Sequence, residues 1–412
     1  MLSVAVIGGG ASGMMAACIA AKNGASVTLF ERGSICGVKL NITGKGRCNV
    51  TNNCDVNTLI ANTVKNGRFL YSAFSAFDSQ AAMAFFEECG VRLKTERGNR
   101  VFPVSDSAKE VTGALKTMMH RLGVKIVKDR ISGVKEDNGA VCGVCGENGA
   151  FYAFDRVIVA TGGMSYPRTG STGDGYRIAK ALGHTVTELS PSLVPLTVKG
   201  NIPKRLEGLA LKNVGLTVTC GSKNVYTDFG EMVFTTNGVS GPMILSASAH
   251  LGRKNIFPYD IVIDLKPALT ADVLDKRILS DFSEAKNRDF ANSLGKLLPS
   301  KLIPIIIELS GIPADKKVNS VTAEERGRLC SLMKAFTLQA VSFGSLDEAV
   351  VTSGGISVKE INPKTMESKL VSGLFFCGEV IDVDAYTGGF NLQIAWATGR
   401  LAGLAAAEKE EW

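Results

Sequence analysis

The chain has 412 residues, of which 45% are hydrophobic and 21% are charged. One hydrophobic core seldom supports this length, so we expect two or three domains. The composition is typical of a soluble globular protein. No apolar run approaches the ~18–20 residues that cross a bilayer, which argues against an integral membrane protein.

The net charge of +7 is concentrated at the start of the chain. Residues 1–130 contain 17 Lys and Arg against 9 Asp and Glu, whereas the remaining residues contain 29 against 30. A basic first third fits the phosphates of a cofactor, an anionic substrate or RNA. The sequence contains no arginine-rich tract and no RNA-recognition motif, so solvated surface charge is the default interpretation.

Ten cysteines, and a start without a basic leader, predict free thiols and a cytoplasmic protein without a secretory signal. The one CxxC pair, Cys142 and Cys145, lies in a hairpin pattern with no second CxxC and no histidine nearby. We therefore expect no metal site.

The first elements along the chain are a strand, a glycine-rich turn and a helix. Val4–Ile7 is an apolar strand run, Gly8–Gly13 has the spacing GxGxxG, and Met14–Ala21 is an apolar helix. A second strand, Ser26–Phe30, ends at Glu31. This combination is typical of the βαβ unit that binds a dinucleotide.

Each position of this unit has an expected role. Gly8 permits the tight turn, Gly10 lets the backbone approach the pyrophosphate, and Gly13 lets the helix pack closely on the strand. The helix N-terminus offers N–H groups and a partial positive charge to the phosphates. Glu31, with Arg32 beside it, disfavours a phosphorylated ribose but does not separate NAD from FAD.

The next segments are a long loop and mixed short elements. Residues 37–52 are too polar and glycine-rich for a strand or a helix, and too long for a simple connection. We expect this loop to wrap a cofactor, with Lys45 or Arg47 facing its phosphates. The pattern then predicts a helical region at 58–90, strands at 91–94 and 100–103, a helix at 108–122, a parallel strand at 124–127 and a hairpin around 131–155.

Another buried strand run, 157–163, ends in glycines, and the loop 164–175 then leads into a helix at 176–182. Serine, threonine and aspartate before a helix fit simple capping. The length of the loop and its Tyr166 and Arg168 equally favour a lining of the active site.

The middle of the chain has a different character. Residues 191–250 alternate and turn often, which predicts a small antiparallel barrel, and 267–309 and 322–336 are amphipathic helices. We expect three parts, which are a dinucleotide-type domain at 1–190 and 345–412, a β-barrel insert at 191–250 and 337–344, and a helical insert at 251–336.

A second signature lies near the C-terminus. The strand from Gly373 ends at Gly378-Glu379, the loop 382–391 follows, and 392–407 is an apolar helix. An acid at the strand end can bind ribityl hydroxyls, and the amides of the helix start can stabilise the negative charge of a reduced flavin. A nicotinamide cofactor requires no such second segment, so we expect FAD. The lack of a second GxGxxG and of a CxxxxC beside the flavin argues against a disulfide reductase.

Four blocks of this sequence resemble the BaiN-like flavoprotein family. They are Gly8–Gly13 with Glu31, the loop ending GKGRCNVTN, the block ATGGMSYPRTGSTGDGY at 160–176, and GEVIDVDAYTGGFNLQIAWATG at 378–399. The resemblance implies an α/β fold with a Rossmann-like FAD-binding domain of the two-dinucleotide-binding type. It also implies an inserted small β-barrel, a helical subdomain and no dedicated pyridine-nucleotide domain.

Carried over position by position, the resemblance implies a set of FAD-binding residues. They are Gly8, Gly10, Ala11, Ser12, Gly13, Glu31, Arg32, Lys39, Gly46, Arg47, Cys48, Ile131, Gly162, Glu379, Asp382, Asn391 and Leu392.

The reactions attributed to this family differ more than its sequences do. They are reduction of unsaturated 3-keto bile acids, reduction of uridine to dihydrouridine in 23S ribosomal RNA, and oxidation of aminoacetone by oxygen. We favour a reductase in which transient NADH or NADPH reduces FAD. An activated C=C of a small molecule, such as a bile acid or steroid, then takes the hydride. Ribosomal RNA and an amine remain as alternative substrates.

Such a reaction needs a proton donor close to the substrate. The three histidines lie outside the four blocks, so the candidates are Tyr166, Tyr386 and Cys48. Each has a simpler interpretation, since Tyr166 can stack on the flavin and Cys48 can be a small buried residue.

Overall fold

The computed structural model describes residues 1–251 and 257–408, which form two compact units. Unit 1 contains Met1–Ser192 and Ser345–Trp412, and unit 2 contains Leu193–Gly344. Each unit has its own hydrophobic core. Within the described ranges, no helix combines the length and the apolar character needed to cross a bilayer.

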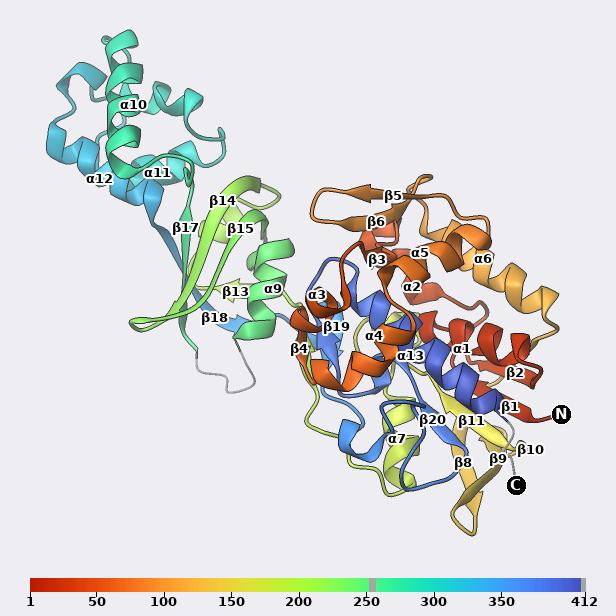
Figure 1. Cartoon of the computed structure of the whole chain (residues 1–412). Helices are drawn as coiled ribbons and strands as arrows, with labels where there is room; N and C mark the ends of the chain where they lie inside the picture. The colour runs from red at the N-terminus through yellow and green to blue at the C-terminus, as the bar shows by residue number, and fades with distance from the viewer. Residues whose placement is uncertain (252–256, 409–412) are drawn as a thin grey trace. The chain divides into compact units, whose positions relative to one another are not determined.

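Unit 1 is centred on a five-stranded parallel sheet with the order β20-β11-β1-β2-β7 (Figure 1). The expected βαβ unit is present, and the strand near the C-terminus lies two places from the first strand. Because this sheet is covered on both faces, its inner strands are continuous apolar runs. The strands are β1 (Ser3–Ile7), β2 (Ser26–Glu31), β7 (Lys125–Lys128), β11 (Arg156–Val159) and β20 (Leu374–Phe376).

Helix α1 (Ala11–Lys22) packs against α6 (Ala108–Arg121) and α13 (Phe390–Ala407). The contact with α13 is made backbone to backbone. A Cβ atom at Gly399 or Gly403 would lie 2.5 Å from a main-chain oxygen of α1. The two glycines therefore bring the first and last helices of the chain together.

A second layer of unit 1 is the antiparallel sheet of β8 (Ile131–Asp137), β9 (Ala140–Gly146) and β10 (Phe151–Ala153). It packs on the main sheet through Phe30, whose ring centroid lies 5.1 Å from that of Tyr152. The expected hairpin around 131–155 is therefore present.

Short elements complete unit 1. The helices are α2 (Val38–Ile42), α3 (Val56–Ala61), α4 (Tyr71–Ala76), α5 (Ser79–Glu88) and α7 (Asp174–Ala181). The strands are β3 (Thr51–Asn52), β4 (Thr63–Lys65), β5 (Leu93–Glu96), β6 (Arg100–Pro103), β12 (Ser190–Ser192), β19 (Val351–Ser353) and β21 (Asp384–Ala385).

Two sequence predictions for unit 1 were wrong. The loop at 37–52 contains helix α2, because Gly37 adopts a left-handed conformation that starts the helix and Leu40 is buried. The region 58–90, which was predicted as helical, contains the helices α3, α4 and α5 but is not helical throughout. It is interrupted by β4, which pairs with β21, and Asp78 starts α5 by accepting a hydrogen bond from Ala81 N.

Unit 2 contains a closed barrel with the strand order β13-β16-β15-β14-β17-β18. The strands are β13 (Leu196–Val198), β14 (Ala210–Cys220), β15 (Lys223–Thr235), β16 (Gly238–Ser240), β17 (Tyr259–Asp264) and β18 (Phe336–Phe343). The helices of unit 2 are α8 (Ile202–Arg205), α9 (Pro242–His250), α10 (Ala271–Glu284), α11 (Ile303–Ser310) and α12 (Ala323–Lys334).

The boundary between barrel and helices differs from the sequence prediction. Strand β17 lies inside the range 251–336 that we had assigned to a helical insert, and α9 lies inside the range assigned to the barrel. The alternating burial of β17 identifies it as a barrel strand between β14 and β18. The helical part is accordingly confined to α10, α11 and α12 and their connections.

Candidate functional site

The glycine fingerprint forms a tight turn at the carboxyl end of β1. Gly8 has a φ of +106°, and a Cβ atom there would lie 2.6 Å from the carbonyl oxygen of Ala160. A Cβ atom at Gly13 would collide with the carbonyl oxygen of Gly8. Both positions thus require glycine for the strand, turn and helix to pack.

Gly10 is different, because a Cβ atom there would meet nothing within 4 Å. Gly10 is the N-cap of α1, which has no side-chain cap and no acidic residue in its first turn. The amides of Ala11 and Ser12 belong to the first turn of α1, so they have no acceptor within the helix and lie at the positive end of its dipole. This arrangement fits a pyrophosphate.

Glu31 at the end of β2 is held by two main-chain amides. Its Oε2 accepts a hydrogen bond from Gly9 N at 2.9 Å, and its Oε1 accepts one from Gly33 N at 2.7 Å. The carboxylate is thus fixed beside the fingerprint turn. Each oxygen retains a lone pair that can accept from a ribose hydroxyl.

Arg32 is turned towards Asp174 at the start of α7. The Asp174 carboxylate also accepts hydrogen bonds from Arg130 at 2.9 Å and from Arg177 at 2.6 Å. Burial raises the pKa of Asp174, but the arginine hydrogen bonds outweigh it and lower the pKa to about 2. This cluster ties β2, β8 and α7 together next to Ile131, which is buried at the start of β8.

A second buried cluster joins four segments at the carboxyl edge of the sheet. Glu379 follows β20, and its Oε2 accepts a hydrogen bond from Lys39 Nζ of α2 at 2.8 Å. Its Oε1 accepts from the hydroxyl of Ser165 and from the amide of Thr352, both at 2.9 Å. Lys39 Nζ also donates to Ser165 Oγ at 2.7 Å. We call these four residues the Glu379 cluster.

Burial raises the pKa of the Glu379 carboxyl, but the Lys39 ammonium and the hydrogen bonds from Thr352 and Ser165 outweigh it. The pKa therefore lies below its usual value. The side chains of Lys39 and Glu379 are 23% and 19% exposed, and Ser165 and Thr352 are fully buried. At neutral pH the cluster consequently holds one positive and one negative charge.

Tyr166 follows this cluster directly. Its main chain is left-handed, with a φ of +51°. The hydroxyl of Thr352 accepts hydrogen bonds from Met164 N at 2.8 Å and Ser165 N at 3.1 Å, which fixes the approach to Tyr166. The Tyr166 side chain is half-buried and its hydroxyl forms no hydrogen bond among the described residues.

The predicted phosphate contact of Arg47 finds no support in the structure. The Arg47 guanidinium donates to Asp106 Oδ1 at 2.8 Å, forms an ion pair with Glu96 and lies over the ring of Phe102. Its charge is thus neutralised locally, because the strands β5 and β6 bring the two acids beside it. Gly46 has a left-handed main chain, and a Cβ atom there would meet only Asn41 O, at 3.9 Å.

Cys48 is fully buried, and burial raises the pKa of its thiol to about 12. It packs in the hydrophobic core of unit 1 with a φ of +60°. A thiol in this environment is a poor proton donor to a substrate. The structure therefore favours the interpretation of Cys48 as a small core residue.

The loop between β20 and α13 is held by polar contacts of its own. Asp382 is buried and forms an ion pair with Lys65. Asn391 accepts a hydrogen bond from Ala385 N at 3.0 Å and donates to Ala385 O at 2.8 Å, so its side chain shapes the loop. Burial, and then Asp384, raise the pKa of Tyr386, which is half-buried in the same loop.

Helix α13 presents a second free N-terminus. Its N-cap is Gly389, with a φ of +101°, where a Cβ atom would collide with the main chain of Thr51. The first turn has no side-chain cap and no acidic residue, and Leu392 is half-buried there. The buried side chain of Gln393 accepts a hydrogen bond from Thr51 Oγ1 at 2.7 Å and so joins this turn to the loop at 37–52.

These features fit FAD. The two uncapped helix starts suit a pyrophosphate and the pyrimidine edge of a flavin. Three buried oxygens, Asn49 Oδ1, Ser79 Oγ and Thr161 Oγ1, lack a partner among the described residues. Asn49 and Thr161 adjoin glycine-rich segments of this site, Asn49 after Gly46 and Thr161 before Gly162. Gly162 beside Thr161 is left-handed, and a Cβ atom there would touch only Ser171.

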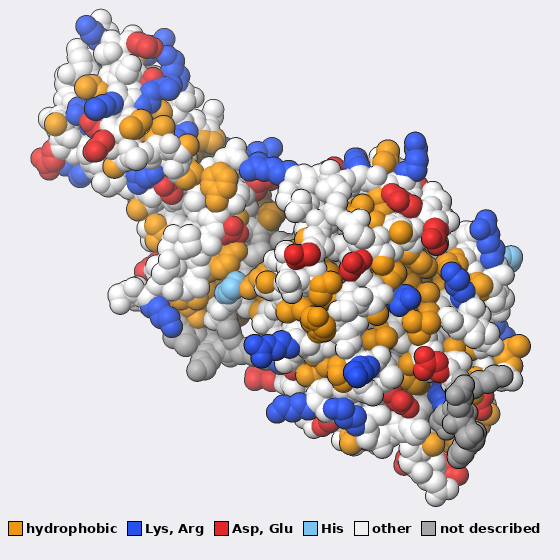
Figure 2. All heavy atoms as spheres, in the orientation of Figure 1, with side chains coloured by type: hydrophobic (Ala, Val, Ile, Leu, Met, Phe, Trp, Pro, Cys, Tyr) orange, Lys and Arg blue, Asp and Glu red, His pale blue; other side chains and the backbone are white. Residues whose placement is uncertain are grey.

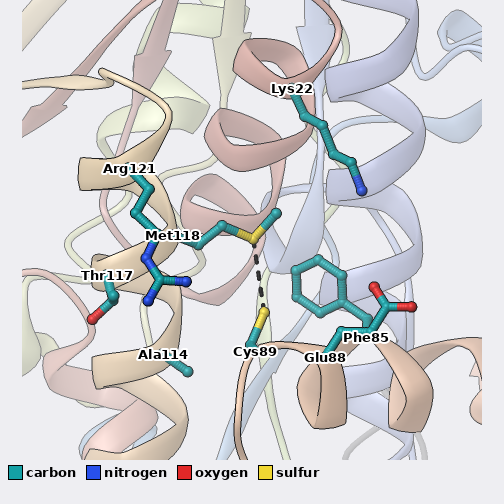
Figure 3. Close-up of a pocket in the computed structure, with 8 residues that line it drawn as sticks. All are labelled: Lys22, Phe85, Glu88, Cys89, Ala114, Thr117, Met118 and Arg121. Atoms are coloured by element: carbon teal, nitrogen blue, oxygen red, sulfur yellow. Dashed lines mark hydrogen bonds between the residues drawn. The ribbon is translucent and has the colours of Figure 1, made fainter.

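A surface pocket of about 220 Å³ lies away from this site (Figure 3). Lys22, Phe85, Cys89, Met118 and Arg121 are among the residues that line it. It lies at the C-terminal end of α1, roughly 18 Å along the helix from Gly10. Its basic residues stand at the ends of α1 and α6, where cations compensate the helix dipole. No group of acids, cysteines or histidines within the described residues could hold a metal ion.

The sequence analysis missed Ser165, Thr352 and Asp174 as site residues. Asp174 and Ser165 lie in the block at 160–176 that the analysis did single out, so the length of that loop was the available signal. Thr352 gave no local signal, because its role depends on contacts with residues 164 and 379.

Comparison with known proteins agrees with this site. The model of the HI0933-like protein Rossmann domain matches residues 2–405. The chain is 32% identical to 3-dehydro-bile acid delta(4,6)-reductase of Clostridium scindens, over 99% of this chain and 100% of that protein. It is 31% identical to ribosomal RNA dihydrouridine synthase of Haemophilus influenzae, over 97% of each chain.

The fold also resembles 3-ketosteroid delta1-dehydrogenase of Sterolibacterium denitrificans, solved in complex with 1,4-androstadiene-3,17-dione. The TM-score is 0.55 at 13% identity, over 99% of this chain and 100% of that chain. At this identity the likeness concerns the fold alone, and it shows that a solved structure has a similar fold over the whole chain.

Proposed function

Because this chain belongs to the HI0933-like family and is an FAD-dependent oxidoreductase, we propose that it reduces a C=C bond conjugated to a carbonyl group, with NADH or NADPH as the electron source. The observation that carries this proposal is the full-length similarity to two proteins named for reductions. A 3-keto bile acid with a Δ4 bond and the uracil ring of uridine share one reactive unit, which is a C=C next to C=O.

Reduction of this unit requires a hydride at the β-carbon and a proton at the α-carbon. FAD, when bound and reduced by NADH or NADPH, would supply the hydride. The electron pair of the C=C would pass through an enolate to the new C–H bond at the α-carbon. The protein has to bind the carbonyl oxygen, exclude water and hold one proton donor near the α-carbon.

We propose Tyr166 as this donor, with Tyr386 as the second candidate. The Tyr166 hydroxyl is free of hydrogen bonds among the described residues, and its main chain is anchored by the Glu379 cluster. A phenol is a usable acid here because the enolate is a strong base. Burial and the neighbouring Asp384 raise the pKa of Tyr386, which makes its hydroxyl a weaker proton donor than an ordinary tyrosine.

A small-molecule substrate is favoured over ribosomal RNA. Several basic residues of the first third are paired with acids, among them Lys39, Arg47, Lys65 and Arg130. On the face shown in Figure 2, Lys and Arg side chains are dispersed among acidic and neutral ones. These pairings leave less free positive charge for phosphates than the sequence total suggests.

The test is anaerobic stopped-flow spectroscopy of the FAD-loaded protein. We expect NADH or NADPH to bleach the flavin, and 4-androstene-3,17-dione to restore its colour while gaining two hydrogens. If only a ribosomal RNA transcript restores the flavin colour, and does so with a steep salt dependence, the substrate is RNA rather than a small molecule. Bleaching by aminoacetone and by neither pyridine nucleotide would replace the reductase by an amine oxidase.

A further inference from the structure

The Glu379 cluster holds two opposite charges at the carboxyl edge of the parallel sheet, which is where ligands bind in open α/β sheets. Lys39 Nζ and Glu379 Oε2 are 2.8 Å apart, and both side chains are largely buried. The other contacts of the Glu379 carboxylate come from neutral groups, the Ser165 hydroxyl and the Thr352 amide. The pair is therefore neutral as a whole, and removal of either member leaves one uncompensated charge.

The position of this pair follows from its neighbours. A Cβ atom at Gly378 would collide with the side chain of Ser12, so Glu379 lies one residue from the first turn of α1. The hydroxyl of Thr398 in α13 accepts a hydrogen bond from Gly378 N at 3.0 Å. Gly378 is thus held between α1 and α13, the two helices whose N-termini fit the pyrophosphate and the flavin. Glu379 is the next residue in the chain.

Charges at such a place act on redox equilibrium. Uptake of two electrons and one proton by bound FAD leaves one added negative charge on the cofactor. A nearby cation favours that state and a nearby anion opposes it, and both effects are strong where water is largely excluded.

We propose that Lys39 and Glu379 set the reduction potential of the bound flavin through opposed and nearly cancelling effects. Lys39 favours the reduced cofactor, and Glu379 opposes it while holding Lys39 in place. The pair thereby keeps the reduction potential of the flavin in the range in which a pyridine nucleotide can reduce it and an activated alkene can reoxidise it. This inference requires bound FAD but not a particular substrate.

The test is the midpoint potential of bound FAD, measured by equilibration with a reference dye in the absence of substrate. Lys39→Met leaves the Glu379 carboxylate alone, so we expect the equilibrium constant for reduction to fall at least tenfold. Glu379→Gln leaves the ammonium alone, so we expect a rise of at least tenfold. For a two-electron couple, tenfold corresponds to about 30 mV.

The double variant Lys39→Met/Glu379→Gln restores neutrality, and its equilibrium constant should return to within about threefold of the wild type. The matched control is Lys296→Met/Glu284→Gln, an exposed Lys–Glu pair of unit 2 with a spacing of 2.7 Å. Neither control substitution should move the flavin potential. If Lys39 and Glu379 had only a structural role, the two single variants would shift the flavin potential in the same direction or not at all.

The proposal is overturned by shifts of equal sign, by shifts no larger than those of the control, or by a double variant as displaced as the single ones. If Glu379→Gln fails to retain FAD, Lys39→Met and Lys39→Arg decide the matter. Arginine keeps the charge and should keep the potential, so an equal shift in both variants contradicts the inference. None of these outcomes involves the substrate, so they leave the proposed reaction to its own test.

Discussion

Thr352 shows how a single buried hydroxyl organises the site. It accepts hydrogen bonds from two consecutive amides, Met164 N and Ser165 N, and its own amide donates to Glu379. The residue after these amides, Tyr166, is left-handed, which is uncommon for a bulky side chain. The local strain at Tyr166 is therefore stabilised by contacts that come from a distant strand.

We expect Thr352→Val to release this segment. Valine keeps the shape of threonine but leaves two buried amides without an acceptor, at a cost of about 1–3 kcal/mol each. Hydrogen exchange should accelerate at residues 164 and 165, and FAD should bind more weakly. Thr352→Ser keeps the oxygen and is the control. If the valine and serine variants exchange at the same rate, the hydroxyl does not hold the segment.

His184 is a buried titratable residue outside the site. Its Nε2 lies 2.9 Å from Ser368 Oγ, its Nδ1 lies 3.2 Å from Glu360 Oε2, and its ring packs on Phe376 of β20. Burial lowers the pKa of His184, and Glu360 opposes this effect only partly. The neutral ring is consequently the form that the folded protein favours.

The sign of the pH dependence follows directly. The pKa of His184 is lower in the folded protein than in the unfolded chain, where it is about 6.5. Its contribution to the free energy of unfolding is therefore complete above pH 6.5 and is lost as the pH falls through the folded pKa. We expect the free energy of unfolding in urea to decrease between pH 7.5 and 5.5. His184→Gln should flatten this dependence, whereas His120→Gln at an exposed position should not. An unchanged slope in His184→Gln would exclude His184 as the cause.

Residue roles were predictable from sequence where they depend on local conformation. Gly8, Gly13 and Glu31 act within one βαβ unit, and their spacing is enough to assign them. The pairing of Arg47 with Glu96 and Asp106 was not predicted, because the two acids lie 49 and 59 residues away and only the folded hairpin brings them close. The pairing of Lys39 with Glu379 was equally invisible, since 340 residues separate them.

At the scale of elements, the packing of α1 on α13 carries the site. The two helix N-termini can serve one cofactor only because the helices touch along Gly399 and Gly403. Sequence identified both helices, because an apolar helix is a local pattern. It did not identify α2 or the division of 58–90, where tertiary pairing of β4 with β21 overrides helix propensity.

We expect Gly399→Ala to weaken this contact. The added Cβ atom would lie 2.5 Å from Ser12 O, so the helices must move apart at a cost of about 1–3 kcal/mol in unfolding free energy. FAD affinity should fall in parallel. Gly113→Ala in α6 is the matched control, because nothing lies within 4 Å of its Cβ, and it should stabilise the protein by about 0.5–1 kcal/mol. Equal effects of the two substitutions would refute a role for close helix contact.

At the scale of the whole molecule, the chain contains two separately packed cores. The core of unit 1 combines both ends of the chain, and that of unit 2 lies within 193–344. The alternation of residues 191–250 was enough to predict an inserted barrel. The sequence assigned β17 wrongly because this strand lies isolated between helical segments and is recognised only by its pairing with β14 and β18.

Two cores predict two thermal transitions in calorimetry. All the residues that fit FAD lie in unit 1, so removal of the cofactor should lower only the transition of that unit. At a free FAD concentration of 100 times Kd, the expected stabilisation is about 2.7 kcal/mol. Hydrogen exchange of peptides from 193–344 reports the unfolding of unit 2 and so identifies the second transition. The exchange rates of these peptides should not depend on FAD. A single transition, or an equal shift of both, would contradict this division.

The central claim is that one FAD lies between the N-terminus of α1 and the N-terminus of α13. The most direct measurement is the electron density of the cofactor in a crystal of the FAD-loaded protein. We expect the pyrophosphate within hydrogen-bonding distance of the amides of Ala11 or Ser12, and the flavin ring at the first turn of α13. Density for the flavin elsewhere, such as the pocket beside Lys22 and Phe85, would contradict the account.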